Sequence, residues 1–263
     1  RQDPPYFWFE TSLLMTKGNY STFVKNFYGH TEATIGMPCR LGKEAGLRRS
    51  FAFRNSFIKC TVCAMVDAGS DDARDVIGML YPAPPGWAEP SGPLPEGKAD
   101  KRGDLYESPH RRVEINKEHL TVLRSWMCIP KDAKVFAYVC TSLEPPSFEY
   151  PISQAVVDML LSECLESFGE DFCKEYVDTT DGWLLPDGST YWLNDRRLAR
   201  RPWVVLGGKY KIFDRIILES KSSCIPRGTL FKRRLPEEYS ALIPVQEFAA
   251  GAASGAVRCL KSE

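Results

Sequence analysis

The chain has 263 residues, of which 43% are hydrophobic and 26% are charged, and these values are typical of soluble globular proteins. The composition excludes disordered and fibrous classes, and the length is sufficient to bury a core without support from disulfides or a metal. The 34 basic residues balance the 34 acidic residues, so no net field favours nucleic acid or an anionic membrane as a partner.

The nine cysteines argue against a disulfide framework, because their number is odd and they are scattered along the chain. We therefore expect a reducing compartment and a cytoplasmic protein. Cys60 and Cys63 have the spacing of a metal or redox pair, but they lie in an apolar run without a second pair or a histidine at ligand spacing. We predict that both are buried strand cysteines, and that the protein holds no metal and no organic cofactor.

The first half of the chain predicts a β-sheet. Residues 6–9 are an aromatic strand signal that is followed by a polar turn and a helical pattern. Residues 47–66 hold an alternating segment and then an apolar run, and residues 76–81 follow after an acidic turn. Together these segments predict a meander of antiparallel strands. Residues 82–103 are rich in proline and glycine, which is typical of a long surface loop.

The second half predicts further strands and one prominent helix. Residues 111–115 and 134–140 have the alternation and composition of strands. Residues 152–168 carry apolar side chains at helical spacing, so we expect an amphipathic helix that caps the sheet. Residues 210–218 are predicted to form a final strand. We find no internal repeat.

Six segments, in this order, resemble the γ-glutamylcyclotransferase-like family. The family's opening strand and turn, Y-F-A-Y-G-S-N-L, is similar to residues 6–13 (YFWFETSL), its R-x-F strand to residues 47–53 (LRRSFAF), and its V-x-G-V-L-Y strand to residues 76–81 (VIGMLY). Its D-x-x-E followed by Y-R-R-V-E-V is similar to residues 104–115, its A-x-x-Y-V strand to residues 135–139 (VFAYV), and its P-P-S-x-x-Y to residues 145–150 (PPSFEY).

The resemblance covers residues 6–176 and implies an α+β fold, in which a small mixed β-barrel is flanked by helices and carries a pocket at one rim. It implies a γ-glutamylcyclotransferase-like domain over residues 1–186. Residues 187–263 would then form a C-terminal extension packed on this core.

The resemblance also implies a reaction. In the family, the α-amino group of a γ-glutamyl amide attacks the γ-carbonyl of the same molecule, which forms 5-oxoproline and releases an amine. A carboxylate with a raised pKa can move the required proton, and Glu107 occupies the family's position for this catalytic group. The alternative is that Glu107 is a solvated loop residue beside Ser108 and Pro109.

The turn after the first strand is the second element that the resemblance assigns to the site. In the family, its backbone N–H groups bind the substrate carboxylate, and Phe9, Glu10, Thr11 and Ser12 take these positions here. Glu10 replaces a glycine and adds a negative charge. Two like charges ~4 Å apart repel by about 4 kcal/mol at an effective dielectric constant of ~20. Standard γ-glutamyl substrates should therefore bind poorly, unless Glu10 points away or is protonated.

Three more residues complete the predicted substrate-binding set. Tyr138 and Tyr150 hold family tyrosine positions and could supply hydroxyl hydrogen bonds, or they could simply pack. His110 replaces a family tyrosine three residues from Glu107. It is either an acid/base partner or a structural histidine at the start of a strand.

Three functions follow as hypotheses. The first is a diverged γ-glutamylcyclotransferase-like enzyme that uses a glutamate for cyclisation, isomerisation or γ-glutamyl removal on a small molecule, as in natural-product biosynthesis. The second is an ordinary γ-glutamylcyclotransferase that acts on γ-glutamyl amines. The third is a non-catalytic protein that binds a small molecule. In each case we expect a monomer or homodimer that binds neither nucleic acid nor membranes.

Overall fold

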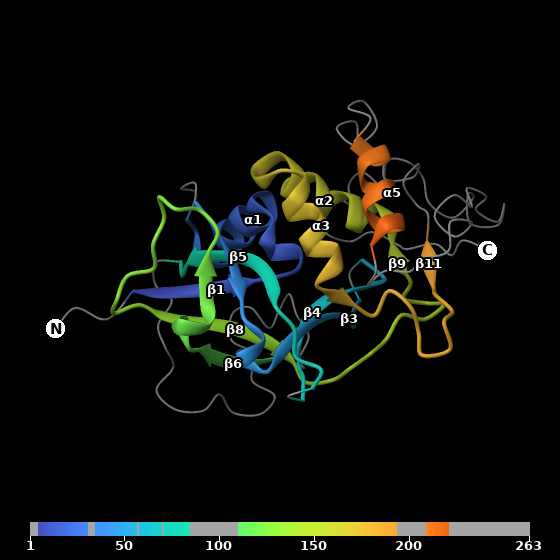
Figure 1. Ribbon diagram of the computed structural model, residues 1–263, viewed down its shortest axis with the longest axis horizontal. Coiled ribbons are helices and arrows are strands. Elements are labelled where there is room, and N and C mark those ends of the chain that lie inside the picture. The colour runs from blue at the N-terminus through green and yellow to red at the C-terminus, as the bar shows by residue number, and fades with distance from the viewer. Residues whose placement is uncertain are drawn as a thin grey trace. The chain divides into compact units, whose positions relative to one another are not determined.

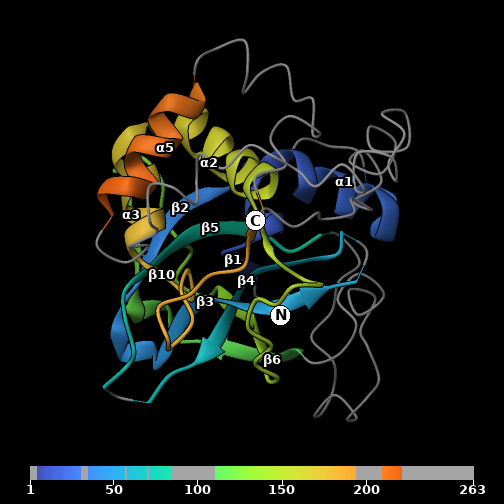
Figure 2. The same cartoon turned by 90° about the vertical axis from the view of Figure 1, so that its right-hand side faces the viewer.

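The computed structural model describes residues 5–30, 35–56, 58–69, 71–84, 110–193 and 209–220. These residues have a mixed α+β structure with a sheet curled into a half-barrel and four α-helices (Figures 1 and 2). The chain divides into two compact units, of which unit 1 comprises Arg1–Arg49 with Ala64–Leu143 and unit 2 comprises Ser50–Cys63 with Glu144–Glu263. The predicted boundary at residue 186 stays a prediction.

Unit 1 holds most of the sheet. Its strand order is β3-β4-β8-β1-β5-β2-β7, and β6 pairs with β8. Strands β3 and β4 belong to both units, because the division falls after Arg49 in β3 and after Cys63 in β4. The elements are β1 (Tyr6–Glu10), α1 (Lys17–Tyr28), β2 (Met37–Leu41), β3 (Leu47–Asn55), β4 (Cys60–Asp67), β5 (Val76–Pro82), β6 (His110–Ile115), β7 (Leu120–Val122) and β8 (Lys134–Cys140), with short 3-10 helices η1 (Leu13–Met15), η2 (Lys43–Ala45) and η3 (Lys117–His119).

Strand β1 lies inside the sheet and separates two faces of unit 1. Alternation along the strand directs Phe7 and Phe9 to one face and Trp8 and Glu10 to the other. On the first face Phe7 and Phe9 join the hydrophobic core, whose other buried members are Cys39, Leu41, Leu47, Met65, Val76, Leu80, Ile115, Leu120, Ala133, Val135, Ala137 and Val139. We call the second face, which carries Trp8, the helix face.

Helix α1 packs against the helix face. The Trp8 ring lies 6.3 Å from the ring of Tyr20, in an edge-on arrangement, and 6.0 Å from that of Phe23. The helix begins after Thr16, whose hydroxyl accepts a hydrogen bond from the Asn19 amide. It ends at Gly29, which adopts a left-handed conformation that glycine tolerates without strain. These caps set the length of α1 over Trp8.

Unit 2 contains the other three helices of the described chain. Strand β10 pairs with β3, and β9 forms a separate two-stranded ladder with β11. Helix α5 packs on α2 and α3, with Phe213, Ile216 and Ile217 buried. The elements of unit 2 are β9 (Ile152–Ser153), α2 (Gln154–Phe168), α3 (Glu170–Asp178), β10 (Thr180–Asp181), β11 (Trp192–Leu193) and α5 (Lys209–Glu219).

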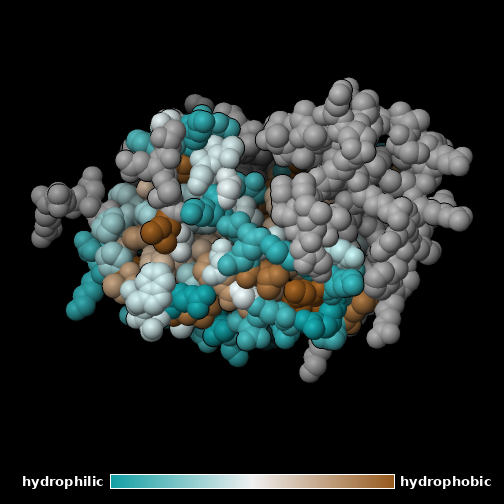
Figure 3. Space-filling model, turned by 90° about the horizontal axis from the view of Figure 1, so that it is seen from above, coloured by the Kyte–Doolittle hydropathy of each residue, from teal (hydrophilic) through white to brown (hydrophobic). Residues whose placement is uncertain are grey.

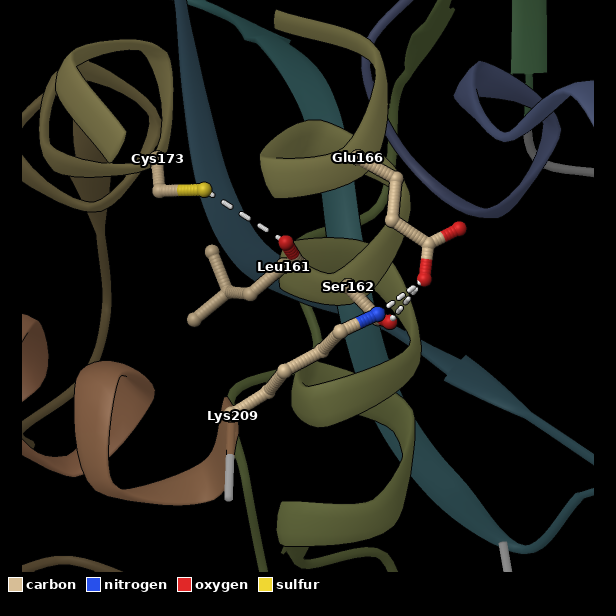
Figure 4. A network of polar contacts seen from close by, with 5 residues as sticks. All are labelled: Leu161, Ser162, Glu166, Cys173 and Lys209. Carbon is tan, nitrogen blue, oxygen red and sulfur yellow. Dashed lines mark hydrogen bonds and ion pairs between the residues drawn. The ribbon is translucent and has the colours of Figure 1, made fainter. Parts of the chain in front are cut away.

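Ion pairs link the three helices of unit 2 at their exposed edges. Lys209 of α5 and Ser162 both donate to the carboxylate of Glu166 on α2 (Figure 4). Arg215 of α5 pairs with Glu170 of α3 at 2.7 Å. The hydrogen bond from Lys174 and the charge of Arg215 lower the pKa of the Glu170 carboxyl. Because exposed ion pairs contribute little to stability, the buried apolar side chains of α5 carry most of its packing energy.

Several predicted elements are confirmed, and two predictions are wrong. Strands form at the predicted positions in residues 6–9, 111–115 and 134–140, and the predicted helix is α2. Residues 210–218, however, belong to helix α5 and not to a strand. The predicted meander is also wrong, because β8 and β1 lie between β4 and β5 in the sheet.

The cysteine prediction is confirmed, since Cys60 and Cys63 are both buried in β4. On the face seen from above, hydrophobic residues occur in small patches between hydrophilic ones (Figure 3). None of the helices in the described residues is long and apolar enough to cross a membrane.

Candidate functional site

The carboxyl end of β1 is buried, and the predicted substrate-binding turn begins there. Glu10 is 4% exposed and pairs with Met79 of β5 as the last partners of the β1–β5 ladder. The chain then turns through Thr11, which is buried, and Ser12, which is half-buried, into η1. A carboxylate in this position is shielded from water, so its interactions with neighbouring charges are stronger than at the surface.

Gly78 of β5 makes room for this turn. A Cβ atom on Gly78 would lie 2.5 Å from the backbone oxygen of Glu10 and 3.0 Å from Cγ2 of Thr11. Only glycine allows the backbones to approach this closely. The family-like glycine in the segment VIGMLY therefore has a structural reason, which is to hold the turn against β5.

Two tyrosines anchor the segment that follows the turn. The Tyr81 hydroxyl donates to the backbone oxygen of Met15 at 2.7 Å, and the Tyr20 hydroxyl donates to that of Pro82 at 2.8 Å. The two rings are stacked, with centroids 3.9 Å apart and an angle of 8° between their planes. Since both hydroxyls are used in this way, these tyrosines position the backbone around the turn.

The turn lies near the point where β8 changes partner along one edge, from β1 to β4. Strand β1 pairs in parallel with the first half of β8, at Lys134–Phe136, whereas β4 pairs in parallel with its end, at Val139 and Cys140. Strand β6 occupies the opposite edge of β8 from Val135 to Cys140. Ala137 and Tyr138 therefore lie between the two parallel partners. Ligands commonly bind outside the carboxyl ends of strands at such a divergence.

The helix face brings together three of the predicted residues, Glu10, Tyr138 and His110. The Tyr138 ring lies 6.2 Å from that of Trp8, which shares its face with Glu10. Tyr138 is the register partner of Arg112, two residues along β6 from His110, so Trp8, Glu10, Tyr138, Arg112 and His110 all project from the same face. The sheet thus places a carboxylate, a phenol and an imidazole that are far apart in the sequence on one face.

The other predicted residues lie elsewhere. Phe9 is part of the hydrophobic core, and the methyl group of Thr11 lies next to the position of the Gly78 Cβ. The Ser12 hydroxyl is buried and makes no hydrogen bond to a described residue. Glu107 lies outside the described residues.

Tyr150 belongs to unit 2 and has a basic environment there. Its ring lies 5.7 Å from the Arg54 guanidinium and 5.6 Å from the Lys59 ammonium, distances at which cation–π attraction operates. Its backbone oxygen accepts a hydrogen bond from Thr61 at 2.7 Å. Within unit 2, these contacts give Tyr150 a packing role, and its role in binding stays a prediction.

Sequence reasoning missed Arg49, which is fully buried in β3. Its Nη1 atom donates to the backbone oxygen of Ile77 at 2.5 Å. Ile77 precedes Gly78, so this guanidinium reaches β5 next to the position where the turn crosses it. The signal was present in the R-x-F segment, but a strand pattern does not show which of its basic residues points inward.

Two of the buried cysteines, Cys39 and Cys173, are poorly suited to act as nucleophiles. Burial raises the pKa of the Cys39 thiol to about 12. Burial, together with the nearby charge of Glu170, also raises the pKa of the Cys173 thiol to about 12. Both thiols are protonated at neutral pH, and the thiolate is the reactive form. Among the described residues, no group of three or more histidine, cysteine or acidic side chains could hold a metal ion.

Comparisons with models of protein families, with curated proteins and with solved structures found no match to this chain.

Proposed function

We propose that the chain is a diverged γ-glutamylcyclotransferase-like enzyme that acts on a small molecule by glutamate acid/base chemistry. One observation supports this proposal above the others. The motif segments in β1, β5, β6 and β8, which are far apart in the sequence, are hydrogen-bonded neighbours in the curled sheet of unit 1. The resemblance implies this kind of barrel, with its pocket at one rim.

The proposed reaction needs no covalent intermediate with the enzyme. The amine of the substrate attacks the γ-carbonyl carbon, a C–N bond forms in the new ring, and the original amide C–N bond breaks. The proton lost by the attacking amine passes through Glu107 to the leaving nitrogen. His110, three residues further along the chain, is the second candidate for this proton transfer.

The burial of Glu10 supports a substrate that is less anionic than a standard γ-glutamyl amino acid. A carboxylate that is 4% exposed is poorly screened by water. In its ionised form it would oppose a substrate carboxylate placed at the same turn. A substrate with a neutral or cationic group at this position would avoid the repulsion.

Replacement of Glu10 tests this view of the substrate. Wild-type protein should release little 5-oxoproline from γ-glutamyl amino acids. Glu10→Gly removes the charge and the side-chain bulk, so the rate with these substrates should rise by roughly several hundred-fold, as expected for the loss of a repulsion of ~4 kcal/mol. The measurement is kcat/KM for 5-oxoproline release from a panel of γ-glutamyl amines.

Glu10→Gln serves as the matched variant, because it removes the charge and keeps the bulk. A similar gain in both variants would assign the effect to charge, whereas a gain in Glu10→Gly alone would assign it to space. If wild type already turns over γ-glutamyl amines well and neither variant changes the rate, the ordinary cyclotransferase is correct. Complete absence of turnover in all three proteins would favour the third hypothesis, a non-catalytic binding protein.

A further inference from the structure

Unit 2 carries two cations and a tyrosine side by side at its surface. We call Arg54, Lys59 and Tyr150 the basic cluster. The Arg54 guanidinium lies 5.7 Å and the Lys59 ammonium 5.6 Å from the centre of the Tyr150 ring. Nζ of Lys59 also donates a hydrogen bond to the Tyr150 hydroxyl at 3.5 Å. The same ring therefore has two positive charges beside it.

The basic cluster is accessible from solvent, so a ligand can reach it without a cavity. Lys59 is exposed, and Arg54 and Tyr150 are half-buried. Nε and Nη2 of Arg54 donate to the backbone oxygen of Pro145, whereas its Nη1 makes no hydrogen bond to a described residue. The Lys59 ammonium and the Tyr150 hydroxyl also keep hydrogens that can be donated to a ligand.

No carboxylate of the described residues neutralises either cation. Arg54 and Lys59 form no ion pair there, although the chain has as many acidic as basic residues. Glu149, which precedes Tyr150, is exposed and pairs with neither of them. Two cations on one ring repel each other and attract an anion, and a bound anion would offset that repulsion.

The backbone at Lys59 gives a second, independent observation. Lys59 has a φ of 50° and is the one residue other than glycine with a positive φ among the described residues. Lysine adopts this left-handed conformation at a cost that glycine does not have. Strain of this kind is often found at functional positions, so the placement of the Lys59 ammonium gives a reason for lysine at this turn.

We propose that the basic cluster binds the phosphate group of a small ligand. A phosphate monoester offers three acceptor oxygens and a charge of about −2 at neutral pH, which suit two cations and a hydroxyl donor. Hydrogen bonds from an arginine or a lysine to phosphate are charge-assisted and stronger than those between neutral groups. This site is a property of unit 2 and does not depend on γ-glutamyl chemistry.

Thermal unfolding of the whole protein in sodium phosphate tests the proposal. With a Kd of ~1 mM, phosphate at ~20 mM should raise the Tm by about 5 °C, through preferential binding to the folded state. Sodium chloride at the same ionic strength is the control and should leave the Tm unchanged. Sodium acetate, a singly charged carboxylate, should give a smaller shift. An acetate shift equal to the phosphate shift would contradict a phosphate site.

Lys59→Gly is the most informative variant, because it removes the ammonium and also relieves the left-handed backbone. Without phosphate, its Tm should equal or exceed that of wild type. The phosphate shift should fall from about 5 °C to about 2 °C, which corresponds to a rise in Kd of about tenfold. Lys131→Ala, an exposed change in unit 1, should keep the full shift and so controls for general effects of phosphate on stability. An equal phosphate shift in Lys59→Gly and wild type would overturn the proposal.

A second variant and a crystal keep the proposal testable if Lys59→Gly does not fold. Tyr150→Phe keeps the ring beside both cations and removes the hydroxyl, so its phosphate shift should be smaller than that of wild type. In a wild-type crystal soaked in phosphate, density for the ion is expected within hydrogen-bonding distance of Lys59 Nζ and Arg54 Nη1. Phosphate density at other places only would overturn the proposal.

Co-sedimentation with vesicles of phosphatidylcholine and phosphatidic acid distinguishes a small ligand from a lipid head group. We expect the protein to stay in the supernatant. Co-sedimentation that is lost in Lys59→Gly would instead assign the phosphate to a membrane lipid and overturn the small-ligand proposal.

Discussion

Glu107→Gln should lower turnover by about 100-fold to 10,000-fold while the protein stays folded. The amide keeps the size and the hydrogen-bonding capacity of the glutamate but cannot take up and release the proton. The effect should appear in kcat, because the proton moves in the chemical step and not on binding. The measurement is the release of amine or 5-oxoproline from the best substrate of the γ-glutamyl panel, together with the Tm of the variant.

Glu114→Gln is the matched control, because this glutamate lies on β6 and is exposed. It should change neither turnover nor Tm. Unchanged turnover in purified Glu107→Gln would show that the proton transfer takes place elsewhere, and His110→Asn would then be the next variant to measure. Loss of folding in Glu107→Gln would instead assign a structural role to Glu107.

Gly78→Ala should destabilise the protein by about 3 kcal/mol and lower its Tm by about 10 °C. The added methyl group would lie 2.5 Å from the backbone oxygen of Glu10, and a backbone atom cannot move aside as a flexible side chain can. The turn after β1 would therefore shift as a whole. Because this turn is the proposed substrate-binding turn, the KM of the folded variant should be higher than that of wild type.

Gly69→Ala provides the comparison for Gly78→Ala. A Cβ atom on Gly69 would meet nothing within 4 Å, so its Tm should stay within about 2 °C of wild type. Equal Tm values for the two variants would mean that the turn can shift to accommodate the added methyl group at little cost in stability. The close approach of β1 and β5 would then not determine the geometry of the site.

Local patterns were sufficient for the strands that have strong signals. The aromatic run in β1 and the mixed β-branched and aromatic residues of β8 each predict a strand in isolation. Residues 210–218 were wrongly predicted as a strand because they also contain aromatic and β-branched side chains. Their buried members Phe213, Ile216 and Ile217 are three and one residues apart, which is helical spacing, and packing on α2 and α3 selects the helix.

The order of strands could not be derived from local patterns. Residues 47–81 alternate with turns and are typical of a meander, yet β4 and β5 are separated in the sheet by β8 and β1. Pairing of β1 with β8 depends on which faces the whole chain can bury, and this is a property of the complete fold. The short strand β2 was missed because its five residues, MPCRL, include a proline and an arginine.

For the candidate site as well, local features could be predicted from the sequence, whereas features that depend on the complete fold could not. The motifs indicated the turn and several side chains, but not their orientation. Glu10 is the clearest case, because its burial could not be inferred from a sequence in which a charged residue is ordinarily exposed. The inward position of Arg49 was missed for the same reason.

The parallel pairing of β1 with β8 has a consequence for how the chain folds. Residues 6–8 pair with residues 134–136, so the contacts of β1 close a long loop of chain. The entropy of that loop must be overcome before the pairing contributes energy. During synthesis, β1 cannot pair with β8 until β8 has left the ribosome. Until then, β8 cannot help to bury the aromatic side chains of β1. Folding of unit 1 should therefore be slow for its size, with β1 joining the sheet late.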